Sequence, residues 1–316
     1  HAAATRLTEE GGLPFGAAGA QLLQACHAPV MALRQNWHRL DDLTDLPPLT
    51  LPPLLLPLAG DQTATLLAHC DGLQAMAPDS PPLRRRVMRT GRLADSAGRG
   101  ADTRWIPRLH TLVGFWPAHL ALQAAGFAIP TLIVGETVTL RLAPLPADEA
   151  RHCLQVLAGY WRQAHGEPLP LPCKTTGVWL QQQDASAARQ AYEGGYHSTG
   201  ERAESPALAR LFPAFEDLDL ARLDALATDL YAPLLASVTS SDIPVNISTI
   251  PPSRSSRWLR LPRRLAKMSG ITGKVHGLSS VNIPPKKAIG RDIIFTSLST
   301  CGRSWPQAYY IRRMSL

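Results

Sequence analysis

Lysine is almost absent from most of this 316-residue sequence: Lys174 is the only one before residue 239. A Walker-type phosphate loop needs a lysine after its second glycine, so that part of the chain has none. A restriction-endonuclease-like nuclease needs an aspartate and then an acid-x-Lys element to bind its metal ion and orient water. Pro172 stands where that acid would be, and proline binds no cation. The sequence therefore predicts no catalytic residue of either kind.

Other patterns are missing as well. The five cysteines form no CxxC pair, and the histidines share no ligand spacing, so we expect neither a disulfide framework nor a metal site. There is no G-x-S-x-G nucleophile motif. No apolar run of about 18 residues without a charge occurs, which predicts no transmembrane helix. A reducing cytoplasm is the expected setting.

The chain starts with His1, and no basic segment followed by an apolar core comes after it. A secretory signal peptide would show that pattern. We expect the sequence to be a fragment of a longer subunit.

Charge is distributed unevenly along the chain. Residues 239–316 contain four lysines and nine arginines against Asp242 and Asp292, a net charge of 13 − 2 = +11. The whole chain carries +7, which leaves 7 − 11 = −4 for residues 1–238. Isoleucine rises from three residues in the first part to nine in the second, and glutamate disappears. We predict a domain over 1–238 and a basic, loosely packed tail over 239–316, whose change of composition a frameshift would explain.

Two segments near the start are rich in glycine or proline. Gly12, Gly16 and Gly19 lack the spacing and the preceding strand of a dinucleotide-binding loop, and they predict a loop that enters a helix at about Ala17. Pro29 is expected to interrupt that helix. Residues 41–59 contain five prolines, which predicts an extended segment lying over the body and excludes a helix or a central strand.

An arginine cluster follows and is the best candidate for a phosphate-contacting surface. Guanidinium groups suit phosphates because they donate hydrogen bonds in a planar fork. The alternative is a solvated charged face or a loop with no ligand. The predicted DNA-binding residues are Arg84, Arg85, Arg86, Arg89 and Arg92.

The stretch from Trp116 to Leu180 sets the fold class. An apolar segment ends at Gly126, and two β-rich runs, 131–134 and 137–142, are separated by Gly135-Glu136. A helix with one apolar face then runs from about Asp148 to Gly166. This order predicts an α/β fold, with a mixed sheet flanked by helices. Further on, short helices are expected before Gly194, after Ser205-Pro206 and over 218–230.

Several motifs in order carry a family resemblance. They are GGLPFGAAGAQLL, WPAHLALQAAGF, PADEARHCLQVLAGYWRQAHGEPLPLP, GVWL, QAYEGG with GERAES, and LYAPLL. Together they resemble the C-terminal part of RecC, the gamma subunit of the bacterial exodeoxyribonuclease V, RecBCD. The resemblance runs through most of residues 9–238, is poor over 60–104 and does not extend over 239–316.

The resemblance implies a domain similar to the nuclease domain of RecB, restriction-endonuclease-like but with a degenerate active site. It implies a non-catalytic role in holding the complex together and guiding DNA during recombinational repair. The implied partners are RecB-like and RecD-like subunits and DNA, both the duplex end and the separated strands. No cofactor is expected in this chain, whereas the complex would use Mg²⁺ and ATP. Recognition of the Chi sequence belongs to other parts of that subunit.

Two other functions stay open at this stage. One is a free-standing restriction-endonuclease-like DNA nuclease whose active site is not recognisable in the sequence. The other is a truncated pseudogene product without function.

Overall fold

The computed structural model describes residues 2–60, 62–97, 104–196, 198–240, 294–295 and 309–313. These residues belong to two compact units, with the division between Ala28 and Pro29. Most of the predicted tail, residues 239–316, lies outside the described residues. No helix in the described ranges is long and apolar enough to cross a membrane.

The described part of the first unit is a short helix, a turn and the start of a long helix. Helix α1 spans Ala2–Glu9, and α2 spans Ala17–His38, so α2 begins in the first unit and ends in the second. The predicted helix start at Ala17 is confirmed. The predicted interruption at Pro29 is wrong, because α2 continues through it. A proline removes one backbone donor from a helix, and here that cost does not end the helix.

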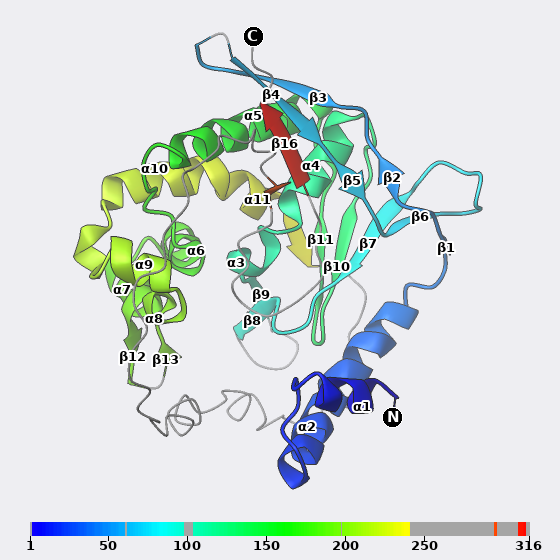
Figure 1. Cartoon of the computed structure of the whole chain (residues 1–316). Helices are drawn as coiled ribbons and strands as arrows, with labels where there is room; N and C mark the ends of the chain where they lie inside the picture. Colours follow the sequence, from blue (N-terminus) through cyan, green and yellow to red (C-terminus); the bar gives the residue numbers. More distant parts are fainter. Residues whose placement is uncertain are drawn as a thin grey trace, which may run out of the picture. The chain divides into compact units, whose positions relative to one another are not determined.

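A six-stranded mixed sheet forms the centre of the second unit (Figure 1). Its strands lie in the order β1 (Thr44–Asp45), β6 (Leu73–Ala75), β7 (Arg84–Met88), β10 (Thr131–Val134), β11 (Thr139–Leu142) and β14 (Val238–Ser240). Strands β7 and β10 are parallel, and the other neighbours are antiparallel. The crossover between β7 and β10 carries α3 (Leu109–Leu112) and α4 (Trp116–Ala124). The predicted mixed sheet flanked by helices is confirmed.

Both faces of the central strands are covered. Ile133, Leu140 and Leu142 lie in the main core, which also takes in α4 and α5 (Ala147–Ala164). Leu132 and Val134, which alternate with Ile133, pack with Leu33, Trp37 and Leu40 at the end of α2. All four residues of β10 are buried, as expected for a strand covered on both faces.

The predicted stretch around these strands is largely confirmed. Helix α4 ends before Gly126, which has φ of +92°, a left-handed conformation that favours glycine after a helix. Helix α5 has Asp148 and Glu149 in its first turn. The turn between β10 and β11 is longer than predicted: Val134 pairs with Thr139, so four residues connect the strands.

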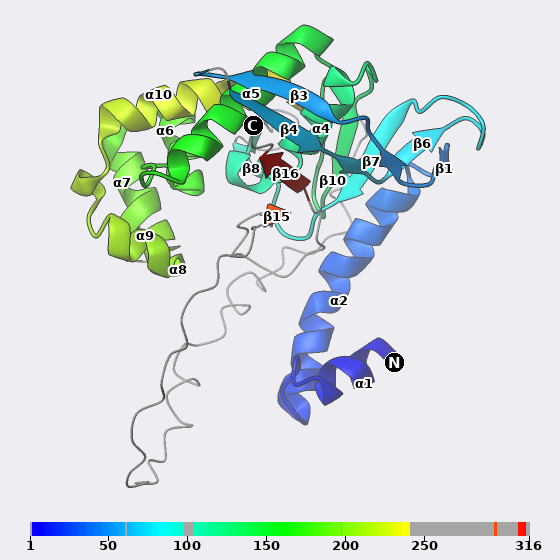
Figure 2. The same cartoon turned by 45° about the horizontal axis from the view of Figure 1, so that its top comes forward.

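A second sheet has the order β15 (Ile294–Phe295), β16 (Tyr309–Arg313), β4 (Gln62–Leu67) and β3 (Leu54–Leu58). The proline-rich segment is extended, as predicted, and Pro57 lies in β3 at the edge of this sheet, where a missing donor is tolerated. Figure 2 shows β3 and β4 beside α5, and Arg162 of α5 donates to the Ala59 carbonyl at 3.0 Å. Two-stranded ladders are formed by β2 (Leu49–Thr50) with β5 (His69–Cys70), and by β8 (Ala94–Ala97) with β9 (Arg104–Pro107).

The group of short helices after α5 shares a small core over most of its length, but Leu234 near its end belongs to the main core. It contains α6 (Cys173–Gln182), α7 (Ala185–Glu193), α8 (Glu201–Glu204), α9 (Pro206–Leu211), the 3₁₀ helix η2 (Phe215–Asp217), α10 (Leu220–Leu230) and α11 (Ala232–Ser237). Strands β12 (Gly194–Gly195) and β13 (Ser198–Thr199) form a hairpin after α7. The predicted helices before Gly194, after Ser205 and up to Leu230 are confirmed, and the Ser205 side chain caps α9.

Candidate functional site: the arginine–aspartate network of β7

The first three residues of the predicted arginine cluster lie in a strand, not in a loop. Arg84, Arg85 and Arg86 begin β7, next to the parallel strand β10. Side chains alternate between the faces of a strand, so Arg84 and Arg86 share one face and Arg85 points to the other. Arg85 is 0% exposed and Arg86 is 2% exposed. The burial of Arg85 and Arg86 differs from the phosphate-contacting surface predicted for the five arginines, and their contact with DNA stays a prediction.

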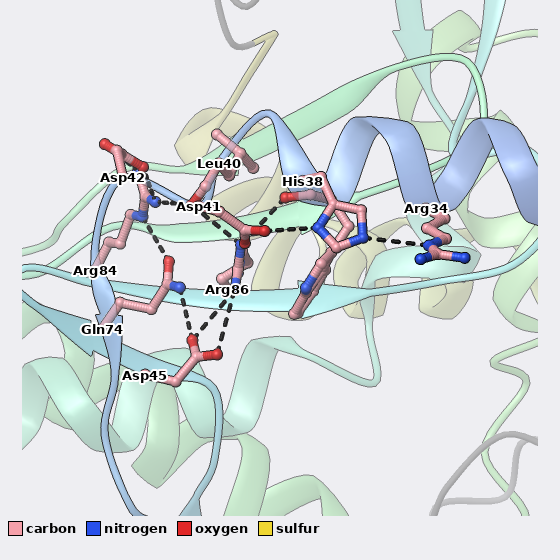
Figure 3. Close-up of polar contacts among 10 residues, drawn as sticks. Arg34, His38, Leu40, Asp41, Asp42, Asp45, Gln74, Arg84 and Arg86 are labelled. Atoms are coloured by element: carbon pink, nitrogen blue, oxygen red, sulfur yellow. Dashed lines mark hydrogen bonds and ion pairs between the residues drawn. The ribbon is translucent and has the colours of Figure 1, made fainter.

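Arg86 is held at the end of α2 (Figure 3). Its Nη1 donates to the carbonyl oxygens of Trp37 and Leu40, at 3.1 and 3.0 Å, and to Asp41 Oδ1 at 2.5 Å. Its Nη2 donates to Asp45 Oδ1 at 3.2 Å, and its guanidinium lies 3.9 Å from the centre of the Trp37 ring. One cation thus binds two carbonyls at a helix end, where positive charge is favoured, and the Trp37 carbonyl also accepts from the Leu40 N–H at 3.1 Å.

Arg84 extends the same network toward the edge of the sheet. It donates to Asp42 Oδ1 at 2.5 Å and to Gln74 Oε1 at 2.8 Å. Gln74, on the neighbouring strand β6, donates in turn to Asp45 Oδ1 at 2.6 Å. Two strands and the segment after α2 are therefore joined by one set of charge-assisted hydrogen bonds.

On the opposite face, Arg85 is bound to Asp71. Its Nε donates to the Asp71 carbonyl oxygen and its Nη2 to Asp71 Oδ1, both at 3.0 Å. Its Nη1 is buried and has no partner among the described atoms. A buried guanidinium without its acid would be costly, so this pair fixes the turn that precedes β6.

The carboxylates of the network respond to these cations. A hydrogen bond from Arg86, with a second contribution from His38, lowers the pKa of Asp41. A hydrogen bond from Arg84 lowers the pKa of Asp42. His38 Nδ1 lies 2.6 Å from Asp41 Oδ2 and continues the network along α2 toward Arg34 (Figure 3). Asp41 and Asp42 are thus kept ionised by arginine.

Arg89 and Arg92 lie beyond the network. Arg89 follows β7, is half-buried, and its backbone N–H donates to the Val134 carbonyl at 2.9 Å. Arg92 is exposed. Their predicted contact with DNA phosphates stays a prediction. Lys174 lies in the first turn of α6, not on a strand, so it does not occupy the position that an acid-x-Lys lysine requires.

The first turn of α6 is instead tied to α8. Both Glu201 carboxylate oxygens accept backbone N–H groups there, from Lys174 at 3.0 Å and from Thr175 at 2.8 Å. This satisfies donors that a helix start leaves free. Within the described ranges, no three histidine, cysteine or acidic residues are grouped so that they could hold a metal ion.

Sequence reasoning missed the acidic half of the network. Asp41, Asp42 and Asp45 stand in the DDLTD segment, which was interpreted only as part of a proline-rich stretch. Two signals pointed to the pairing. The triplet of arginines is followed by Val87 and Met88, so it could be a strand, and three acids directly follow an apolar helix.

The geometry defines an α/β domain whose central parallel strand carries arginines, each paired with a nearby acid. The family model described as the RecC C-terminal domain matches residues 1–184 of this chain. The match covers more than half of the sequence, and the chain belongs to this family. A search of curated proteins gave no match. Membership of the family indicates a role in the RecBCD complex.

Proposed function

We propose that the chain is a non-catalytic scaffold and DNA-guiding domain of a RecBCD-type exodeoxyribonuclease V, acting in recombinational repair of double-strand breaks. The observation that carries the proposal is the family match over residues 1–184. The proposed partners are RecB-like and RecD-like subunits, together with the duplex end and the separated DNA strands.

The arrangement of β7 supports the non-catalytic part. A restriction-endonuclease-like enzyme collects carboxylates at neighbouring strands to bind a metal ion. Here β7 contributes cations, and Asp41, Asp45 and Asp71 each form an ion pair with one of them. A carboxylate bound by a guanidinium has fewer lone pairs for a cation. We interpret the sheet as a nuclease-like scaffold with a degenerate active site.

Co-purification tests the assembly. A RecB-like subunit expressed together with this chain should be retained by an affinity tag on the chain and should elute with it as one species. The chain alone, with Mg²⁺, ATP and linear duplex or single-stranded DNA, should neither cut DNA nor hydrolyse ATP. Cleavage that co-elutes with the chain and disappears in Lys174→Ala would contradict the proposal and favour a free-standing nuclease.

The DNA-guiding part makes a separate prediction for Arg89 and Arg92. Each phosphate that a protein neutralises adds about 0.9 to the slope of log affinity against log salt on duplex DNA. The double variant Arg89→Ala/Arg92→Ala should therefore bind duplex more weakly without regard to sequence, with a slope reduced by about 2. Fluorescence anisotropy over a salt series measures both quantities.

The matched control removes the same charge elsewhere. Arg141 and Arg210 are exposed on β11 and α9, and Arg141→Ala/Arg210→Ala changes the net charge equally. If both double variants lower the slope alike, the effect is one of overall charge, and Arg89 and Arg92 do not form a DNA-binding surface.

A further inference from the structure

Strand β4 belongs to the domain core, but it has no charged residue or proline that would prevent another strand from pairing with its edge. Ala64 and Leu66 are buried in the main core, and β3 covers one edge of the strand. The sequence of β4 is QTATLL, without a charged residue or a proline. Natural proteins protect exposed strand edges with lysine, proline, bulges or a covering segment, because an open edge invites pairing with another chain.

The other edge of β4 is covered by a segment from the far end of the chain. Strand β16 pairs with it antiparallel, from Tyr310 opposite Leu67 to Arg313 opposite Ala64, and Figure 2 shows the two strands side by side. The edge therefore accepts an extended segment over at least four residues in register.

Strand β16, which covers the edge, and strand β4, which supplies it, come from different parts of the sequence. Strand β4 lies within residues 1–184, which match the family model, whereas β16 lies outside that range. Residues 239–316 also differ from the rest in composition, with most of the isoleucine and lysine of the chain. The part of the chain that matches the family supplies the open edge, and a different part supplies its cover.

We propose that this edge of β4 is a strand-acceptor site for an extended segment of a partner subunit, and that residues 309–313 occupy it in this chain. Adding a strand to a sheet edge is a general mode of peptide recognition, in which backbone hydrogen bonds supply affinity. Strands β4 and β3 carry no charged residue, and the segment paired with β4 here, Tyr309–Arg313, is basic and rich in aromatic and β-branched residues. We take a partner segment of the same composition as the one that fits. The partner assignment rests on the proposed function.

Hydrogen exchange tests the cover in the full chain. Successive N–H groups of a strand point to opposite edges, so Tyr310→Pro/Ile311→Pro removes a donor toward β4 whichever residue supplies it. Of amides 63–67, those that point toward β16 should exchange slowly in the natural chain and at least 10-fold faster in this variant, whereas those that point toward β3 should change less. The control Tyr310→Thr/Ile311→Val keeps good strand formers and should leave exchange unchanged. If the amides of β4 that point toward β16 exchange as fast as an exposed loop in the natural chain, the proposal is overturned, even if the proline variant does not fold.

Peptide binding tests the acceptor site. A labelled peptide of residues 307–314, QAYYIRRM, should bind the folded proline variant and restore slow exchange to the amides of β4 that point away from β3. It should bind the natural chain and the Thr/Val control at least 10-fold more weakly, since their edge is filled. A folded proline variant that does not bind the peptide would contradict the acceptor site.

Competition identifies the occupant. A RecB-like subunit that assembles with the proline variant should displace the labelled peptide. If the complex forms and the peptide stays bound, the proposal that a segment of the partner subunit occupies the β4 edge is wrong. If no complex forms, the proposed function fails, while the peptide result still stands for the site itself.

Discussion

Arg86→Ala should lower the free energy of unfolding of the second unit by about 2–4 kcal/mol. Removing one partner of a buried ion pair generally costs about 3–5 kcal/mol. Here Asp41 and Asp45 are partly exposed and can regain water, which reduces the cost. The carbonyls of Trp37 and Leu40 lose a donor, and the Trp37 ring loses its cation. Both losses increase the cost in free energy of unfolding. Urea unfolding followed by tryptophan fluorescence measures the change.

Arg92→Ala is the matched control, because it removes the same side chain from an exposed position a few residues away. Its effect should stay within about 0.5 kcal/mol. Arg86→Lys keeps the charge but loses the planar fork, so its loss should be intermediate. Equal stability of the Arg86→Ala and Arg92→Ala variants would show that the network contributes nothing to the fold, and the buried arginines would then need another explanation.

Local patterns made much of the fold predictable. The alternation in 138–142 and the apolar face of the helix predicted from about Asp148 to Gly166 are properties of single elements. A strand formed at Thr139–Leu142 and a helix at Ala147–Ala164, close to the predicted bounds. The glycine after α4 and the Ser205 cap are likewise set by one or two residues. Such signals depend on backbone geometry over a few residues, so a single sequence contains them.

The arrangement of the arginines was not predictable in the same way. A run of three arginines usually indicates a solvated face, because burying a guanidinium costs several kcal/mol. Its burial becomes favourable only when acids about 40 residues earlier in the chain reach the same strand, as Asp41 and Asp45 do. That pairing depends on the placement of α2 against β7, and no local pattern specifies it. Pro29 shows the reverse case, since a local rule predicted a helix end that the surrounding structure did not require.

His119 should make the fold sensitive to mild acid. The ring is buried in α4, with Nδ1 3.0 Å from Thr131 Oγ1 and Nε2 3.0 Å from the Ala143 carbonyl, and it stacks on Trp116. The carbonyl can only accept, so Nε2 carries the proton and Nδ1 accepts from the threonine hydroxyl. The neutral ring satisfies both partners. Burial lowers the pKa of His119 to about 4, outweighing the bond to Ala143.

The direction of the pH effect follows from that pKa. Between about pH 6.5 and 4 the unfolded chain binds a proton on this histidine that the folded chain does not, so stability falls as the pH falls through this window. The shift from 6.5 to about 4 corresponds to a loss of up to about 3 kcal/mol, complete near pH 4. Burial also lowers the pKa of His110 to about 4, and its contribution has the same sign.

Urea unfolding at several pH values separates His119 from the other groups. His119→Gln keeps a polar side chain that has no charge at any pH, so its stability should fall less steeply between pH 6.5 and 4 than that of the natural chain. His152→Ala removes an exposed histidine from α5 and is the matched control for the loss of one imidazole. The difference in slope between the natural chain and His119→Gln gives the number of protons that His119 binds only in the unfolded state. This number should approach one near pH 5. A His119→Gln variant with the natural slope would mean that the buried ring titrates as it does in water, and that the contacts with Thr131 and Ala143 do not hold it neutral.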